Sequence, residues 1–178
     1  MPVFMVSMLS MAKKEGANAM KDEYEIYLRP LREEDAKTSW RWRNDPRVWA
    51  QTVSRPDREV TEAMELDWIR KALSDPTRRN FAIVLKNGDR YVGNAYLHDI
   101  QGGGAHIGLF IAIPELWGKG IGTRVHAILH QIARDELGLS EIRTTIRVAN
   151  IGSLKAAQKA GSIETSRDDT FVYLTRKL

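Results

Sequence analysis

Short runs of apolar and β-branched residues, bounded by proline, glycine or asparagine, recur along the chain and predict strands. Pro30 ends the first run, because proline lacks the amide hydrogen that a sheet ladder needs. The dipeptide Asn87-Gly88 separates two further runs and is a strong signal for a tight hairpin turn. Strands are expected over residues 24–29, 81–85, 91–97, 105–113 and 142–148, with one or two closing strands over 163–175.

Helical spacing of apolar residues fills the intervals between these runs. Acidic residues follow Leu31, which favours a helix start, and Asn44-Asp45-Pro46 breaks a helix. Gly138 stands at the usual C-terminal position for glycine after the third helical segment. Helices are expected over residues 31–43, 61–74, 121–137 and 153–159, whereas residues 47–58 are expected to be irregular. The order of elements predicts one mixed α/β domain over residues 23–178.

Composition narrows the classes of protein that the chain can belong to. A chain of 178 residues can bury a substantial single core. It has no cysteine, which excludes disulfides, a thiolate nucleophile and a cysteine-based zinc site, and which suits a cytoplasmic location. No apolar segment approaches the ~20 residues of a membrane span. Residues 1–22 are expected to form a flexible N-terminal extension.

The net charge of +4 favours acidic partners. A cofactor with several phosphates uses such a charge as well as a nucleic acid does, and nucleic acid is the less favoured of the two. The charge alone does not distinguish them, so the motifs must.

Three alternating glycines, Gly118, Gly120 and Gly122, lead from a predicted strand into a predicted helix. Glycines leave the backbone amides accessible, and the start of the helix adds partial positive charge, so the segment predicts an anion site. A nucleotide P-loop requires Lys-Ser/Thr after its last glycine, and a dinucleotide fingerprint requires glycine where Thr123 stands. Neither of these two motifs fits. Close packing of the helix on a sheet is the structural alternative for the glycines.

Three segments together resemble the GNAT superfamily of acetyl-CoA-dependent N-acetyltransferases. The loop 117–122 is similar to the family's pyrophosphate loop, with Trp117 where Gln or Arg is usual. Asn150-x-x-Ser153, followed by residues 159–161, is similar to the family's late helix, and residues 42–46 are typical of its branch of ribosomal-protein N-terminal and amino-sugar acetyltransferases. The resemblance covers residues 24–178.

This resemblance implies a mixed, mainly antiparallel sheet flanked by about four helices, with strands splayed at an acetyl-CoA site. Acetyl-CoA would be the co-substrate, and no metal is implied. Asn150 could hydrogen-bond the pantetheine or thioester end, cap its helix, or do both. Outer phosphates could meet Lys119, Arg124, Lys155 or Lys159. The residues implied in cofactor binding are Phe110, Ile111, Ala112, Trp117, Gly118, Lys119, Gly120, Ile121, Gly122, Thr123, Asn150 and Ser153.

The same resemblance points to catalytic residues and to two departures from the family pattern. His106 stands where many relatives have a glutamate base, and histidine can accept a proton near pH 7. Ala157 stands where many relatives have the tyrosine that protonates the departing thiolate. Ser153 is a candidate for that second role, with Tyr96, Tyr173 and water as alternatives.

A metal site is not expected. His126 and His130 are four residues apart on one predicted helix, but no third ligand stands at motif spacing.

The acceptor is expected to be a primary amine, either a protein N-terminus or an amino sugar or other small molecule, that attacks the thioester directly. The resemblance places its binding residues at Trp42, Arg43, Trp49 and Tyr96, and arginines beside aromatics suit a phosphate- or carboxylate-bearing acceptor better than a polycation. An acyl-CoA-binding module of the same fold with little or no catalysis is the alternative. No membrane partner is expected, and a homodimer is the one protein assembly considered.

Overall fold

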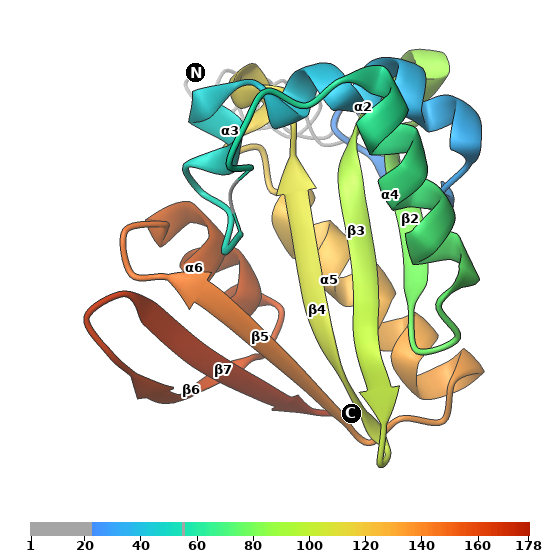
Figure 1. Cartoon of the computed structure of the whole chain (residues 1–178). Helices are drawn as coiled ribbons and strands as arrows, with labels where there is room; N and C mark the ends of the chain where they lie inside the picture. Colours follow the sequence, from blue (N-terminus) through green and yellow to red (C-terminus); the bar gives the residue numbers. More distant parts are fainter. Residues whose placement is uncertain (1–22, 55) are drawn as a thin grey trace, which may run out of the picture.

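The computed structural model describes residues 23–54 and 56–178, so the predicted extension over residues 1–22 lies outside the described part. A seven-stranded sheet with the order β1-β2-β3-β4-β5-β7-β6 forms the centre of the molecule (Figure 1). The strands are β1 (Ile26–Pro30), β2 (Arg79–Leu85), β3 (Arg90–Gln101), β4 (Gly104–Ile111), β5 (Glu141–Arg147), β6 (Ile163–Arg167) and β7 (Phe171–Lys177). The helices are α2 (Ala36–Arg43), α3 (Pro46–Trp49), α4 (Glu62–Ser74), α5 (Ile121–Gln131) and α6 (Ile151–Lys159).

The pairing of β4 with β5 is the one parallel contact in the sheet of the described residues, and it is short. Only four residue pairs join them, from Gly104–Glu141 to Ile107–Thr144. Beyond this point the two strands diverge, as Figure 1 shows. All other neighbouring strands are antiparallel. The expected mixed, mainly antiparallel and splayed sheet is confirmed.

Helices pack on both faces of the sheet and bury its apolar residues. On one face, Val125 and Leu129 of α5 pack against β3, β4 and β5 in the largest hydrophobic cluster. On the other face, Ile69 of α4 and Ala36 of α2 pack against β2. The alternation along β4 therefore sends Ile107 and Leu109 toward α5, and His106, Gly108 and Phe110 toward the side of α2 and α4.

Most predicted elements occur within a few residues of their expected bounds, and one expectation was wrong in part. Residues 47–58 were expected to be irregular, yet Pro46–Trp49 form a short helix. Pro46 fits the first helical position, and the Asp45 carboxylate caps the helix by accepting a hydrogen bond from the Arg47 amide at 2.9 Å. The closing segment consists of two strands, β6 and β7.

A buried carboxylate joins α2 to α4. The Glu65 side chain is 2% exposed and accepts hydrogen bonds from Ser39 Oγ at 2.7 Å and Arg43 Nε at 3.2 Å. The Arg43 guanidinium also lies over the Trp68 ring, 4.7 Å from its centroid. A buried charge without its partner is costly, so these contacts fix the relative position of the two helices.

We expect Glu65→Ala to lower the free energy of unfolding by about 2–4 kcal/mol, because it leaves the Arg43 charge and the Ser39 hydroxyl without their partner. The exposed neighbour Asp67 serves as control, and Asp67→Ala should change stability by about 0.5 kcal/mol or less. Urea unfolding of both variants measures the difference. Equal free energies of unfolding for the two variants would show that Glu65 does not hold α2 and α4 together.

Two histidines lie on the buried side of α5. His126 is 1% exposed and His130 is 6% exposed, and their ring centroids are 5.8 Å apart. Burial, with a smaller contribution from His130, lowers the pKa of His126 to about 3. Burial, together with the charge of Arg176, lowers the pKa of His130 to about 4. Both rings are therefore neutral in the folded protein at pH 7.

We expect stability to fall as the pH falls below about 6.5, because the unfolded chain then binds protons that the folded chain refuses. Each fully buried histidine of this kind contributes a slope of about 1.4 kcal/mol per pH unit between its unfolded and folded pKa values. His126→Gln should reduce the slope between pH 6.5 and 5 by about that amount. Urea unfolding at several pH values measures the slope, and an identical slope in the variant would refute the expectation.

Candidate active site

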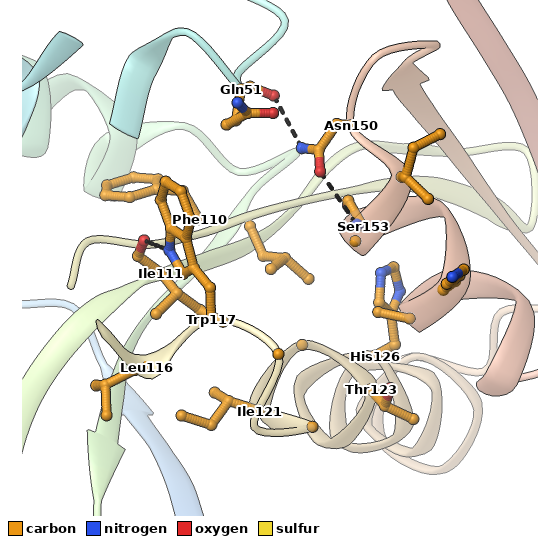
Figure 2. A pocket seen from close by; sticks show the side chains of 18 of the residues that line it. Gln51, Phe110, Ile111, Leu116, Trp117, Ile121, Thr123, His126, Asn150 and Ser153 are labelled. Carbon is orange, nitrogen blue, oxygen red and sulfur yellow. Dashed lines mark hydrogen bonds between the residues drawn. The ribbon is translucent and has the colours of Figure 1, made fainter. Parts of the chain in front are cut away.

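The divergence of β4 from β5 opens a cavity of about 520 Å³ between the glycine loop, α5 and α6. Figure 2 shows Phe110, Ile111 and Trp117 on one side of it, Ile121 and Thr123 below, and Asn150 and Ser153 on the other side. The backbone edge of β4 after Ile107 has no β5 partner here. An extended ligand with its own amides can pair with such an edge.

The glycine loop has the geometry of an anion site. Gly118 and Gly120 have φ values of 74° and 79°, in the left-handed region that favours glycine. Gly120 is the N-cap of α5, so the eleven-residue helix directs its free amides and partial positive charge at the cavity. Nothing lies within 4 Å of where a Cβ at either glycine would be. A diphosphate therefore fits in space, charge and hydrogen-bond donors.

The basic residues expected near outer phosphates divide into two groups. Lys155 and Lys159, on α6, line the cavity. The Lys119 ammonium lies 5.5 Å from the centroid of the Tyr24 ring, and Arg124 donates to the Tyr24 carbonyl at 2.7 Å. Lys155 and Lys159 are thus the pair placed to meet phosphates.

Two of the predicted cofactor residues also hold the loop in place. The Trp117 indole Nε1 donates to the Ile111 carbonyl at 2.9 Å, so the loop is fastened to the end of β4. The Ala112 amide donates to the Val92 carbonyl at 2.8 Å, on the β3 side. This carbonyl and this amide are already engaged, so ligand contacts to β4 must use the other backbone groups of its free edge.

Asn150 caps α6 and fastens a distant segment across the opening. Its Oδ1 accepts from the Ser153 amide at 3.1 Å, and its Nδ2 donates to the Gln51 carbonyl at 3.2 Å (Figure 2). Arg147 supports the same segment, donating to the carbonyls of Thr52 at 2.7 Å and Val53 at 3.0 Å. Each polar atom of the Asn150 side chain therefore has one partner within the protein, and Nδ2 keeps a second N–H. The closure by Gln51–Val53 has no motif that sequence reasoning could have found.

We call the point where β4 and β5 diverge the fork. A second cavity, of about 400 Å³, lies on the other side of this fork, against α4 and the face of β3 and β4 that carries His106. The predicted residues Arg43, Tyr96, His106 and Ser153 line it. The two cavities meet, because they share part of their lining. The shared residues are Gln51, Thr52, Leu109, Phe110, His126, Asn150 and Ser153.

Two histidines stand side by side in the second cavity. His98 and His106 face each other across β3 and β4, with ring centroids 5.3 Å apart. Burial lowers the pKa of His106, and the charge of Arg143 lowers it further. Burial also lowers the pKa of His98, while Asp99 acts in the opposite direction. Both imidazoles are thus neutral and able to accept a proton at pH 7.

Asp99 gives His98 a fixed orientation. The His98 Nδ1 lies 3.0 Å from Asp99 Oδ2, which favours a proton on Nδ1 and leaves Nε2 as the acceptor. His98 was missed by sequence reasoning, because the pairing register that places it opposite His106 is not visible in the sequence.

The other predicted acceptor residues differ in role. Trp42 is 9% exposed and packs on Tyr91 with ring centroids 4.6 Å apart, so it belongs mainly to the core beside the cavity. Arg43 lines the cavity while paired with Glu65. Trp49 lines neither of the two cavities.

His126 reaches the junction of the two cavities from α5. Figure 2 shows its ring projecting toward Ser153. Its Nδ1 is buried without a hydrogen-bond partner in the described part of the chain. Sequence reasoning considered this histidine only as half of a metal pair. Among residues 23–54 and 56–178, no group of three histidine, cysteine or acidic residues could hold a metal ion.

Comparison with known proteins agrees with this geometry. Residues 25–163 match the family described as "Acetyltransferase (GNAT) domain". The "Probable N-acetyltransferase YjcK" of Bacillus subtilis (strain 168) is 28% identical over 150 residues, which are 76% of this chain and 79% of the relative. No helix in the described residues is long and apolar enough to cross a membrane.

Solved structures share the fold. The spermidine N-acetyltransferase from Vibrio cholerae, in complex with CoA and spermine, has a TM-score of 0.76 at 17% identity, over 85% of this chain and 95% of that one. The aminoglycoside acetyltransferase AAC(6')-Ib, in complex with coenzyme A, has a TM-score of 0.72 at 18% identity, over 86% and 95% of the two chains. The chain belongs to the GNAT acetyltransferase family and is an acetyl-CoA-dependent acetyltransferase.

Proposed function

We propose that the protein transfers the acetyl group of acetyl-CoA to a primary amine, which attacks the thioester directly. The supporting observation is that an anion-binding cavity and an imidazole-bearing cavity meet where β4 leaves β5. Direct transfer needs donor and acceptor to meet at one point. Among the described residues there is no cysteine to carry an acyl group between them.

The first cavity holds acetyl-CoA, which supplies the activated acetyl group as a thioester. The amides between Gly118 and Thr123 and the start of α5 bind its diphosphate. Lys155 and Lys159 add positive charge beside them. Trp117 keeps the loop against β4, so the binding elements are in place before the ligand arrives.

His106 accepts the proton that the amine must lose. A primary amine near pKa 10 is mostly protonated at pH 7, and only its neutral form is a nucleophile. Because burial and neighbouring charge lower its own pKa, the His106 imidazole is neutral and available as a base. It lines the second cavity from the middle of β4, on the same face as Phe110 at the junction.

Ser153 is the proposed source of a proton for the departing thiolate. Ala157 is fully buried against β5 and β7 and cannot donate one. Ser153 lines both cavities, and a serine hydroxyl can pass on a proton from water. The neutral His126 ring lies at the same junction and offers a further N–H donor there.

The cofactor assignment is tested by two isosteric substitutions in the loop. Gly120→Asn and Gly120→Asp both tolerate the left-handed backbone, but only aspartate places a negative charge at the diphosphate position. We expect Gly120→Asp to bind CoA about tenfold or more weakly than Gly120→Asn, by titration calorimetry. Without CoA, the two variants should have equal thermal unfolding temperatures, which shows that both fold equally well. Equal affinities for CoA would contradict a diphosphate at this loop.

The role of His106 is tested by His106→Gln, which keeps a polar side chain and removes the base. We expect the acetylation rate, followed as thiol release, to fall by about a hundredfold, with little change in acetyl-CoA affinity. The acidic limb of the pH–rate profile, expected below pH 6.5 in the parent, should disappear.

His98→Gln is the matched control. If this variant loses the acidic limb while His106→Gln keeps it, the base is His98 and the assignment of His106 is wrong.

A further inference from the structure

The second cavity has an unusual charge balance. Arg78, His98 and His106 line it, and the Arg143 side chain lies close enough to His106 to lower its pKa. Among the described residues that line it there is no aspartate or glutamate. A cavity for a polyamine or another polycation would need carboxylates, because like charges repel in a partly dehydrated site.

Arg78 is the arginine lining this cavity that forms no ion pair with a described carboxylate. Its Nε is buried without a hydrogen bond, and in the described part of the chain no carboxylate lies within ion-pair distance of its guanidinium. Its guanidinium carbon lies 5.1 Å from the centroid of the Tyr96 ring. Unsatisfied buried donors are costly, so a position of this kind calls for a ligand or another specific explanation.

Tyr96 holds Arg78 in a defined place. The Tyr96 ring packs directly over Gly108, where a Cβ would lie 2.2 Å from the ring. This glycine lets the ring lie flat against β4, and the guanidinium stacks on the ring. The position of the Arg78 guanidinium is therefore fixed by the packing of Tyr96 on the sheet, unlike that of a freely moving surface arginine.

The acidic residues near Arg78 are already engaged. The Asp75 carboxylate accepts hydrogen bonds from the Thr77 amide at 2.8 Å and the Thr77 hydroxyl at 2.7 Å. Asp99 binds His98. By contrast, Arg43 in the same cavity is neutralised by Glu65. The sequence thus supplies a carboxylate for one cavity arginine and not for the other.

We infer that the acceptor amine carries an anionic group, a carboxylate or a phosphate, that binds Arg78. The inference rests on the proposed function and names the class of its acceptor. An anion in the cavity would pair with the positive charge of Arg78, which lines it, and a short chain from the anion would place the amine in the same cavity as His106. Arginine suits either anion, because its planar donors match both geometrically.

Binding of the anion can be measured without turnover. With CoA present to occupy the glycine loop, inorganic phosphate is titrated while the Nε–H resonances of the arginines are followed by NMR. We expect the Arg78 resonance to shift with a saturable curve. Arg78→Gln should weaken this phosphate binding by about tenfold to a hundredfold. If no phosphate binds at Arg78 while CoA occupies the glycine loop, the inference is overturned.

The matched control is Arg79→Gln. Arg79 is the exposed neighbour whose guanidinium donates to the carbonyls of Pro76 at 3.3 Å and Arg78 at 2.7 Å, and it lines neither cavity. This variant should bind phosphate as the parent does. Equal losses in both variants would show a general charge effect and would also overturn the inference.

Kinetics separate the two anions and test the substrate class. The ratio of kcat/KM is compared within matched pairs: β-alanine against β-alaninamide for carboxylate, and O-phosphoethanolamine against ethanolamine for phosphate. We expect a ratio of about ten or more for one pair in the parent, and near one in Arg78→Gln. A preference for the uncharged partners, or for spermidine, would refute the inference while leaving acetyl transfer intact. If no amine is acetylated, the proposed function fails, and the phosphate titration still decides the role of Arg78.

Discussion

The whole site depends on the short pairing of β4 with β5, which stops well before β4 ends. β4 and β5 share only four parallel residue pairs, after which a row of β4 backbone groups has no strand partner. Unpaired backbone groups in the interior are costly, so the fork is stable only if its edges are bound by something else. The protein binds part of this edge itself, through the Trp117 indole on the Ile111 carbonyl. The rest suits the amides of a pantetheine arm, which explains why a structural irregularity and a binding site coincide.

The same fork explains why residues distant in sequence form one site. Arg147 and Asn150 lie where β5 turns toward α6, and both donate to backbone carbonyls of Gln51–Val53. That segment then covers the opening and lines both cavities. The two cavities meet there because they share lining residues from β4, α6 and this segment. His126 on α5 packs on the opposite face of the sheet, yet it also reaches the junction of the two cavities, because β4 and β5 are separated there.

The sequence predicts those features that have a local cause. Asn87-Gly88, the alternating glycines and the cap of α6 at Asn150 act over a few residues, and the elements that they predict are present. Register is not a local property, so the pairing of His98 with His106 and the packing of Tyr96 on Gly108 could not be predicted. Trp49 was assigned to the acceptor by resemblance, but it lies on the short helix α3 and lines neither of the two cavities. Most residues that line the first cavity belong to motifs, whereas those that line the second are brought together by tertiary contacts.

The contrast between two arginines shows what the fold adds to composition. Arg43 and Arg78 both line the second cavity, and both stack on an aromatic ring. Arg43 is the more conspicuous in sequence, because it lies in a tryptophan-rich motif, yet its charge is balanced by Glu65 across the interface of α2 and α4. Arg78 follows an ordinary turn before β2, and no carboxylate in the described chain forms an ion pair with it. Arg78 is partly buried, lines the cavity and has no ion-pair partner, so its position says more about the charge of a ligand there than a count of basic residues does.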